Sequence, residues 1–447
     1  MLSAEQNRLV TQTDRGTGCG ELMRRYWQPA ALTEELSDAR PAKAVRLMGE
    51  DLVLFRTESG GYGLIGRKCP HRGADLCFGR LEDGGLRCTF HGWLFDEAGR
   101  CLQQPAEPKG SNFHAKIRHT AYPCIERSGI VFAYMGPGVP PPLPAFDCFE
   151  VPSEHSFAFK GFVDCNWLQL NEVGIDPAHA SFLHRFFDDE ADDAYGQQFR
   201  FSTEENALAI TKVLREFDCP ELELEQTETG LRIFALRRLN DAEMHVRVTN
   251  QIFPNAIIIP ISNEMMLTQW HVPIDDRTSW WYAIFSSFSE LVDKEKMRND
   301  RLKLYTLPDY RPRRNAANDY GFDPDEQRSS TYTGMGMDIN VHDQWAVESL
   351  GTVQDRTQEH LGTSDKAIIA NRKLLIAAIE TVTQGGTPEI DLRPTDPTLC
   401  RGPVAIDTVA PAANWREAWK RTAIERRRRS PWARDLWPAE TADASES

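Results

Sequence analysis

The chain has 447 residues, of which 41% are hydrophobic and 26% charged, a composition typical of a globular protein of two or three domains. Its formal net charge of −15 argues against a nucleic-acid-binding role. No apolar run of about 18 residues is present, which argues against a membrane span, and the polar N-terminus lacks the apolar core of a signal peptide. We therefore expect a cytoplasmic protein, whose ten cysteines are better candidates for metal ligands than for disulfides.

Residues 20–35 predict a short amphipathic helix followed by an extended segment. From about residue 43 to residue 136, short β-type segments alternate with glycine-containing turns, a pattern typical of a small antiparallel domain. A proline-rich connector over 137–146 marks the clearest domain boundary. The chain is accordingly divided into an N-terminal segment, a small domain and a large C-terminal domain, over 1–42, 43–136 and 137–447.

The large domain begins with a predicted helix from about Trp167 to His184, in which Pro177 can sit at a break or at a new first turn. Alternating and β-branched residues then predict strands of one antiparallel sheet, over 199–217, 222–239, 244–261, 265–274 and 279–288. Helices are predicted over 290–305, 339–350 and 364–384 and in part of the basic tail 414–437. The polar stretch 308–336 is long for a loop, and such loops are often lids.

Two Cys/His pairs in the small domain are the strongest chemical signal. They are Cys69-x-His71 and, after sixteen intervening residues, Cys88-x2-His91, each followed by a glycine that permits tight turning. Two cysteines and two histidines can hold zinc, or a [2Fe–2S] cluster in which two histidines replace two cysteines on one iron. Because each loop supplies one thiolate and one imidazole, the pattern favours the iron–sulfur cluster, with a zinc site as the alternative.

The stretches 69–76 (CPHRGADL) and 88–96 (CTFHGWLFD) closely resemble the Rieske iron–sulfur motif. Together with 166–184, they make most of the chain similar to the alpha subunits of Rieske non-haem iron aromatic ring-hydroxylating oxygenases. Segments 20–30 and 355–368 are closest to the phthalate dioxygenase-like branch.

The resemblance implies an α+β fold. A small antiparallel β Rieske [2Fe–2S] domain (43–136) would adjoin a helix-grip-like catalytic domain (137–447), with the segment 1–42 packing on the catalytic domain and a helical tail at the C-terminus. It implies two cofactors, a Rieske cluster and a mononuclear Fe²⁺. The cluster ligands would be Cys69, His71, Cys88 and His91.

A non-haem iron oxygenase needs two histidines, one carboxylate and open coordination positions for O2. His179 and His184 fit the first requirement. Five residues correspond to about 500° on an ideal helix, which places the second side chain about 140° from the first. For both rings to reach one ion, we predict a helix irregularity between them, for instance a π-bulge.

The resemblance places the third ligand, an aspartate, on a later helix. The matching run is 341–349, and Asp343 is the predicted ligand. Glu348 is the alternative and Asp338 is less favoured, whereas His342 is expected to be structural.

Asp176 precedes His179 by three residues and therefore lies on the same helical face. The resemblance implies that this aspartate links a ligand histidine to a histidine of a neighbouring subunit's Rieske cluster and conducts electrons, a role in catalysis. The alternative is a helix-capping aspartate. Glu172 is either a polar group behind the iron site or part of a solvated helix face.

Four arginines lie on the predicted strands, and period-2 alternation turns only some of them toward a pocket: Arg232, Arg237, Arg238 and Arg247. An inward arginine suits a substrate carboxylate through a bidentate pair. Arg247 best matches the pocket-facing position of phthalate-type relatives, with a solvated arginine as the alternative. Ile257, Ile259 and Phe285 are expected in the core.

The chain lacks the Gly-x-Gly-x-x-Gly nucleotide signature, so we expect a separate NAD(P)H-dependent flavin and iron–sulfur reductase. The resemblance implies a terminal oxygenase that uses O2 to cis-dihydroxylate an aromatic carboxylate such as a phthalate or benzoate, within a homotrimer or a stacked hexamer. The alternatives are a Rieske monooxygenase or O- or N-demethylase, and, in another class, a non-catalytic iron–sulfur electron-transfer protein.

Overall fold

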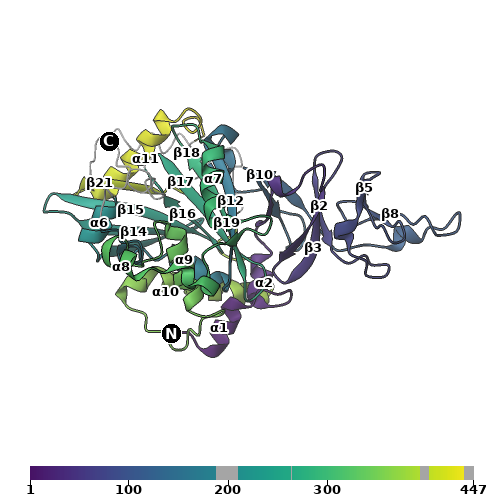
Figure 1. Cartoon of the computed structure of the whole chain (residues 1–447), viewed down its shortest axis with the longest axis horizontal. Helices are drawn as coiled ribbons and strands as arrows, with labels where there is room; N and C mark the ends of the chain where they lie inside the picture. Colours follow the sequence, from purple (N-terminus) through teal and green to yellow (C-terminus); the bar gives the residue numbers. More distant parts are fainter. Residues whose placement is uncertain (188–209, 263, 393–401, 437–447) are drawn as a thin grey trace.

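The computed structural model describes residues 1–187, 210–262, 264–392 and 402–436. These residues form a narrow body of short sheets and a larger body built on an extended sheet flanked by helices (Figure 1). The expected α+β architecture, with a small antiparallel part and a larger sheet-and-helix part, is confirmed.

The narrow body contains two four-stranded antiparallel sheets. The first has the order β2-β3-β4-β9, with strands Ala42–Leu47, Glu50–Arg56, Tyr62–Gly66 and Ala121–Tyr122. The second has the order β5-β6-β7-β8, with strands Arg80–Glu82, Gly85–Arg87, Leu94–Phe95 and Cys101–Gln103. Two-residue turns with positive φ at both positions join β2 to β3 (Met48-Gly49) and β5 to β6 (Asp83-Gly84), which is the geometry that matches the right-handed twist of paired strands.

The N-terminal segment folds as helices α1 (Ala4–Thr11) and α2 (Gly18–Met23) followed by strand β1 (Gln28–Leu32). The helix and extended segment predicted over 20–35 correspond to α2 and β1, whereas α1 was not predicted. Both helices pack against α10 (Lys366–Thr383) of the larger body. Strand β1 pairs with β11 of a three-stranded sheet, whose other strands are β11 (Ile130–Ala133) and β10 (Cys124–Arg127). The segment therefore contacts both bodies.

The larger body is organised by an eight-stranded antiparallel sheet. Its order is β12-β18-β17-β16-β15-β14-β13, and β21 pairs with β15 beside β16. The strands are Ser156–Val163, Ser279–Ser287, Met265–Pro273, Ala256–Pro260, Glu243–Ile252, Gly230–Arg238, Glu221–Thr227 and Ile406–Pro411. Alternate residues face opposite sides, so one face packs on helix α11 (Trp415–Arg429) and the other meets the helices that carry the site.

One predicted strand is wrong. Within the segment 199–217, residues 199–209 lie outside the described part, and the remainder contains helix α6 (Ile210–Glu216). Its β-branched residues suggested a strand, but Ile210 and Leu214 stand four residues apart and both line the pocket described below. The helical spacing therefore prevails, because it turns both apolar side chains to one surface.

The other predicted helices are confirmed as α7 (Lys294–Leu304), α9 (Ile339–Ser349), α10 and α11. Arg427 of α11 pairs with the buried Asp147 of helix α3 (Asp147–Glu150), which ties the C-terminal helix to the core. The polar stretch 308–336 contains strand β20 (Arg311–Pro312), a 3₁₀ turn over Ala316–Gly321 and helix α8 (Pro324–Ser329). Strand β20 pairs with β19 (Tyr305–Thr306).

A buried lysine joins the two bodies. Lys160 of β12 lies 2.6 Å from Glu35, which also pairs with Lys43 of β2, and its ammonium group lies 4.3 Å from the Trp280 ring centroid. Burial lowers the pKa of Lys160 to about 8, and the Glu35 carboxylate opposes this shift. The Lys160–Glu35 ion pair, buried beside aromatic rings, therefore connects the two bodies.

Among the described residues, no helix is long and apolar enough to cross a membrane. The cytoplasmic location expected from the sequence stays a prediction.

Helix α4 (Trp167–Gly174), which leads into the site, is anchored by a buried ion network. Glu172 accepts hydrogen bonds from Arg356 (2.9 Å and 3.1 Å) and from Arg372 (2.5 Å and 3.0 Å), and Arg372 also binds Glu359. Of the two alternatives for Glu172, the solvated helix face is wrong, because its side chain is 7% exposed. The network fixes α4 against α10 and the segment that precedes α10.

Replacing Glu172 with Gln should lower the free energy of unfolding by about 3–5 kcal/mol, because two buried guanidinium groups lose their carboxylate. Burial alone would raise the pKa of Glu172, but Arg356 and Arg372 hold it below the ordinary value of 4.5. The stabilisation is therefore present above about pH 4.5 and is lost as the pH falls through the lower folded value. Urea titrations at pH 7 and pH 4 measure both effects.

Glu225→Gln is the matched control, because Glu225 pairs with Arg232 at the surface. Its cost should stay below about 1 kcal/mol. Equal losses in the two variants would contradict the anchoring role of Glu172.

Candidate functional site

The two Cys/His loops of the narrow body share one hydrogen-bond frame. In the first, the Cys69 N–H donates to Ala74 O (2.8 Å) and the Gly73 N–H donates to Cys69 O (2.8 Å). In the second, the Cys88 N–H donates to Trp93 O (2.8 Å) and the Gly92 N–H donates to Cys88 O (2.9 Å). Both glycines have positive φ, 76° and 73°. In each loop, the hydrogen bond back to the cysteine carbonyl comes from the fourth residue after the cysteine. The histidine is the second residue after Cys69 but the third after Cys88.

The four side chains form a two-sided site. Cys69 and Cys88 are 2% and 3% exposed, whereas His71 lies at the surface and its ring centroid is 4.5 Å from that of His91. Burial raises the pKa of Cys69 to about 11, and the N–H groups of His71 and Arg72 act in the opposite direction. Paired buried thiols and paired outer imidazoles fit a [2Fe–2S] cluster with one pair on each iron.

Trp93, which the sequence reasoning did not single out, stacks on His71 with ring centroids 4.5 Å apart and an interplanar angle of 8°. Trp93 directly follows Gly92, and this position beside the second Cys/His pair is the sequence feature that could have indicated its contact with His71. The stacking fixes the orientation of the outer imidazole.

The second site begins where α4 ends. The helix stops at Gly174, and after Pro177 the chain forms a single helical turn, α5 (Ala180–Leu183), flanked by His179 and His184. The predicted irregularity does not take the form of a π-bulge, because ordinary bonds run from the Leu183 N–H to His179 O (2.8 Å) and from the His184 N–H to Ala180 O (3.3 Å). The rings converge because His184 is the C-cap, with φ −106° and ψ 27°, and so leaves the helical path.

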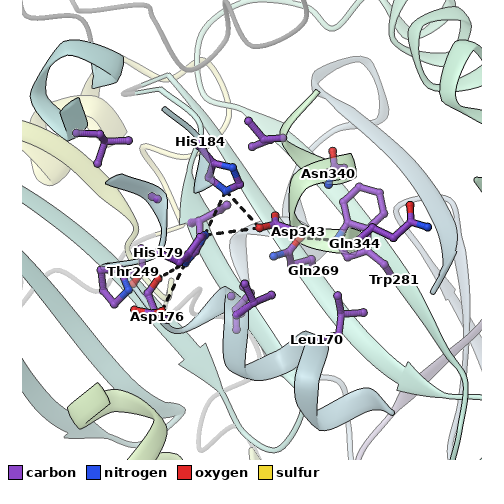
Figure 2. Close-up of a pocket in the computed structure, with 18 of the residues that line it drawn as sticks. Leu170, Asp176, His179, His184, Thr249, Gln269, Trp281, Asn340, Asp343 and Gln344 are labelled. Carbon is purple, nitrogen blue, oxygen red and sulfur yellow. Dashed lines mark hydrogen bonds and ion pairs between the residues drawn. The ribbon is translucent and has the colours of Figure 1, made fainter. Parts of the chain in front are cut away.

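Asp343 of α9 completes the group. The His179 and His184 Nε2 atoms are 3.2 Å apart, and they lie 3.6 Å and 3.3 Å from Asp343 Oδ1 (Figure 2). Ligands about 2.1 Å from one metal ion, with angles between 90° and tetrahedral, are separated by about 3.0–3.4 Å. Asp343 Oδ1 is buried without a hydrogen-bond donor, so three lone pairs meet at one point. Among the described residues this is the group whose geometry suits a single metal ion.

The alternative carboxylates are engaged elsewhere. Glu348 accepts hydrogen bonds from the Asp164 N–H (2.9 Å) and the Tyr320 hydroxyl (2.8 Å). Asp338 caps α9 by accepting from the Asn340 N–H (2.8 Å) and pairs with Arg301 (3.1 Å). Neither carboxylate reaches the two histidines.

Hydrogen bonds set the tautomers of both histidines. His179 Nδ1 donates to the backbone carbonyl of Asp176, and His184 Nδ1 faces His342 Nδ1 at 3.5 Å. His342 Nε2 lies 2.8 Å from Gly336 O and must donate there, which leaves its Nδ1 as the acceptor. Burial lowers the pKa of His342 to about 4, so it stays neutral. Both candidate ligands therefore turn an unprotonated Nε2 toward Asp343.

The Asp176 carboxylate lies beside this group without joining it. Its Oδ1 accepts from the Ala178 N–H (2.8 Å), and its Oδ2 lies 4.0 Å from His179 Nδ1. Asp176 therefore makes the capping contact and also lies close to His179, which the sequence analysis had treated as alternatives.

A pocket opens from the metal group between the sheet and helices α4, α5, α6 and α9. Figure 2 shows Asp176 and Thr249 beside His179, with Gln269 and Trp281 on the far side of Asp343. Much of the wall is apolar, and it includes Leu170, Val173, Ile210, Leu214, Ile257 and Ile259. Ile257 and Ile259 thus line the pocket instead of only the core, whereas Phe285 is buried as expected.

Among the four candidate arginines, Arg247 lines the pocket. Its guanidinium pairs with Asp407 of β21 and donates to Pro260 O (2.9 Å). Arg237 is buried on the same face of the sheet without lining the pocket, and Arg232 pairs with Glu225 (2.8 Å) on the opposite face. Asp407 was missed, because only the pairing of β15 with β21 brings it near.

Comparison with known proteins agrees with this geometry. Residues 26–123 match the model of the Rieske [2Fe-2S] domain, and residues 133–428 match the LigXa C-terminal domain like family. The chain is 34% identical to the phthalate 4,5-dioxygenase oxygenase subunit of Pseudomonas putida, over 86% of this chain and 88% of the relative.

Two further relatives are similar over most of their length. The phenoxybenzoate dioxygenase subunit alpha of Ectopseudomonas oleovorans is 33% identical over 84% of this chain and 85% of its own. The 5,5'-dehydrodivanillate O-demethylase oxygenase subunit of Sphingobium sp. is 32% identical over 89% of this chain and 85% of its own.

Solved structures share the fold. A variant of the Pseudomonas putida CBB5 protein NdmA with theobromine has a TM-score of 0.53 and 19% identity, covering 86% of this chain and 96% of that one. The carbazole-bound oxygenase and ferredoxin complex of carbazole 1,9a-dioxygenase has a TM-score of 0.50 and 20% identity, covering 84% and 93%.

Family matches across both bodies, together with oxygenase relatives of more than 30% identity, set aside the alternative of a non-catalytic electron-transfer protein. The chain belongs to the Rieske non-haem iron oxygenases, as the terminal oxygenase subunit of a multicomponent system that carries a [2Fe–2S] cluster and a mononuclear iron.

Proposed function

We propose that this oxygenase uses O2 to cis-dihydroxylate an aromatic carboxylate of the benzoate or phthalate type. The carrying observation is the convergence of His179, His184 and Asp343 on a largely apolar pocket that also contains the Arg247 guanidinium. An apolar wall suits an aromatic ring, and an arginine suits a carboxylate. Relatives named for phthalate and phenoxybenzoate support this substrate class.

In this proposal, His179, His184 and Asp343 hold the mononuclear iron, and Cys69, His71, Cys88 and His91 hold the cluster. When bound, the iron supplies the O2-activating centre and the cluster supplies electrons one at a time. The protein orients both histidines through Asp176 O and His342, and its apolar wall keeps water from the ring. Overall, arene, O2, NADH and a proton give the cis-dihydrodiol and NAD⁺.

A second candidate is O-demethylation or another monooxygenation, which the O-demethylase relative favours. There a methoxyarene, O2, NADH and a proton give a phenol, formaldehyde, water and NAD⁺. The same ligand set serves both reactions, so the products must discriminate.

We also propose that electrons pass between copies of the chain in a homotrimer or stacked hexamer. Strands β5 and β8 lie at the end of the narrow body remote from α9, so one chain keeps its own cluster loops far from its own iron site (Figure 1). A neighbouring copy would place its exposed His71 near Asp176, which borders His179. The electrons enter from a separate NAD(P)H-dependent reductase, directly or through a ferredoxin of the kind seen with the carbazole oxygenase.

Asp343→Ala should lower turnover at least 100-fold, because it removes a ligand while leaving the cluster loops untouched. Iron analysis should show loss of the mononuclear iron, whereas the visible absorbance of the [2Fe–2S] cluster should persist. Glu348→Gln, on the same helix, is the control and should keep its iron. Retained turnover in Asp343→Ala with an intact cluster spectrum would refute the assignment.

Asp176→Asn should slow electron transfer from the reduced cluster to the iron site about 10–100-fold without loss of either cofactor. An asparagine can still accept from the Ala178 N–H, so the local fold should persist. Single-turnover oxidation of the pre-reduced cluster measures the rate.

The variant should keep the native mass of the wild type, at three or six chains. A monomeric wild type, or an unchanged transfer rate in Asp176→Asn, would contradict transfer between subunits.

Aromatic carboxylates should support reductase-dependent O2 uptake by the intact enzyme. With isotope-labelled O2, cis-dihydroxylation places two labelled oxygen atoms in the product, whereas demethylation releases formaldehyde. If no benzoate or phthalate stimulates uptake but methoxyarenes do, the second candidate replaces the first.

A further inference from the structure

The wall of the pocket that contains Arg247 carries an unusual set of charges. On β14 and β15, the residues that share the pocket-facing side include Ala235, Arg237, His245 and Arg247, because Ala235 pairs with Arg247 and Arg237 pairs with His245. Strand β21 places Asp407 opposite Arg247. Two guanidinium groups and one carboxylate are thus gathered at one end of these strands.

Asp407 is fully engaged by its neighbours. It accepts from His245 Nε2 (2.5 Å) and from Arg247, whose other terminal nitrogen donates to Pro260 O. Burial alone would raise the pKa of Asp407, but His245 and Arg247 hold it far below its usual range. The carboxylate is therefore ionised at neutral pH.

Among the described residues, Arg237 forms no ion pair, although Asp407 is near enough to raise its pKa slightly against the effect of burial. It is 2% exposed, its Nε donates to Phe217 O (2.9 Å), its Nη2 reaches Pro177 O (3.4 Å), and its Nη1 has no partner. Burial and the nearby Arg247 lower its pKa to about 10, which leaves it protonated at neutral pH. Pro177, whose carbonyl it approaches, lines the pocket.

His245 belongs to this set through its contact with Asp407. Its Nε2 donates to Asp407, and its Nδ1 is buried without a partner. The charges of two arginines and one aspartate, counted over Arg237, Arg247 and Asp407 among the described residues, sum to one positive charge.

The remaining ionisable groups of the pocket lie at or beside the proposed iron site. Asp176, His179, His184 and Asp343 form or flank the proposed iron site, and burial lowers the pKa of His271 to about 3, which keeps it neutral. A buried charge without a partner is costly, and an anion placed beside Arg247 would balance it. A second anionic group would in turn have no partner against the apolar wall.

We propose that Arg237 and Asp407 together set the pocket to prefer an aromatic monocarboxylate over both its uncharged amide and a dicarboxylate. Arg247 is the group that meets the carboxylate, Arg237 acts from behind it, and Asp407 limits the surplus to one charge. The inference deepens the proposed function and rests on it for the aromatic part of the substrate.

The test compares equilibrium binding of benzoate, benzamide and phthalate to the purified holoenzyme by isothermal titration calorimetry. The wild type should bind benzoate at least tenfold more tightly than benzamide or phthalate. Arg237→Gln should reduce the benzoate-to-benzamide preference at least tenfold, although Arg237 does not line the pocket. Asp407→Asn adds one net positive charge and should raise phthalate binding relative to benzoate at least tenfold.

Arg232→Gln is the matched control, because Arg232 lies on the same strand, faces the other way and pairs with Glu225. It should leave all three ratios unchanged. Arg237→Lys keeps the charge and should keep the benzoate preference. Each ratio is taken within one variant, so partial unfolding cancels.

An unchanged benzoate-to-benzamide ratio in Arg237→Gln, or an unchanged phthalate-to-benzoate ratio in Asp407→Asn, overturns the inference. If Arg237→Gln does not fold, Asp407→Asn decides, because damage cannot produce a gain in phthalate binding. If these ratios shift as expected but no aromatic acid stimulates O2 uptake by the wild type, the proposed reaction fails while the charge preference stands.

Discussion

Three unprotonated atoms must meet within about 3.5 Å on chain segments some 160 residues apart, and much of the larger body can be understood from that requirement. A carboxylate oxygen without a donor and two bare imidazole nitrogens are unfavourable neighbours unless a cation lies between them. Three features of the fold hold them there. Glu172 anchors α4, the helix is interrupted around Pro177, and Gly336 O accepts a hydrogen bond that orients His342. The first feature fixes the position of α4, the second fixes the orientation of His179, and the third fixes the tautomer of His184.

How far the sequence alone could reach depends on the range of the forces involved. The cluster loops are short and local, so their residue types and glycines already specify the frame that the structure contains. The histidine pair was also readable, but the way its rings converge was not, since the spacing of an ideal helix cannot reveal a C-cap conformation. Asp343 was reached through family resemblance, because nothing in its own run distinguishes it from Glu348.

Features that depend on tertiary contacts were out of reach. Asp407 meets Arg247 only because β21 pairs with β15, and the arginine partners of Glu172 lie on segments 184 and 200 residues further along. The β-branched character of α6 favoured a strand, and the apolar surface above the sheet selected a helix. A charge balance such as that of Arg237, Arg247 and Asp407 is a property of a folded wall and has no sequence signature.

The buried ion pairs of Glu35 with Lys160 and Lys43 restrict how the two bodies can move, and therefore how electrons can be delivered. Glu35 pairs with Lys160 of the large sheet and with Lys43 of β2 at once, so moving the narrow body away from the sheet would break one of these pairs and leave a buried charge with fewer partners. Delivery by a moving tether is therefore disfavoured, and the narrow body keeps a fixed position relative to the sheet of its own chain. The two cofactor sites of one chain therefore keep a constant separation, which makes the chain a rigid frame for electron transfer.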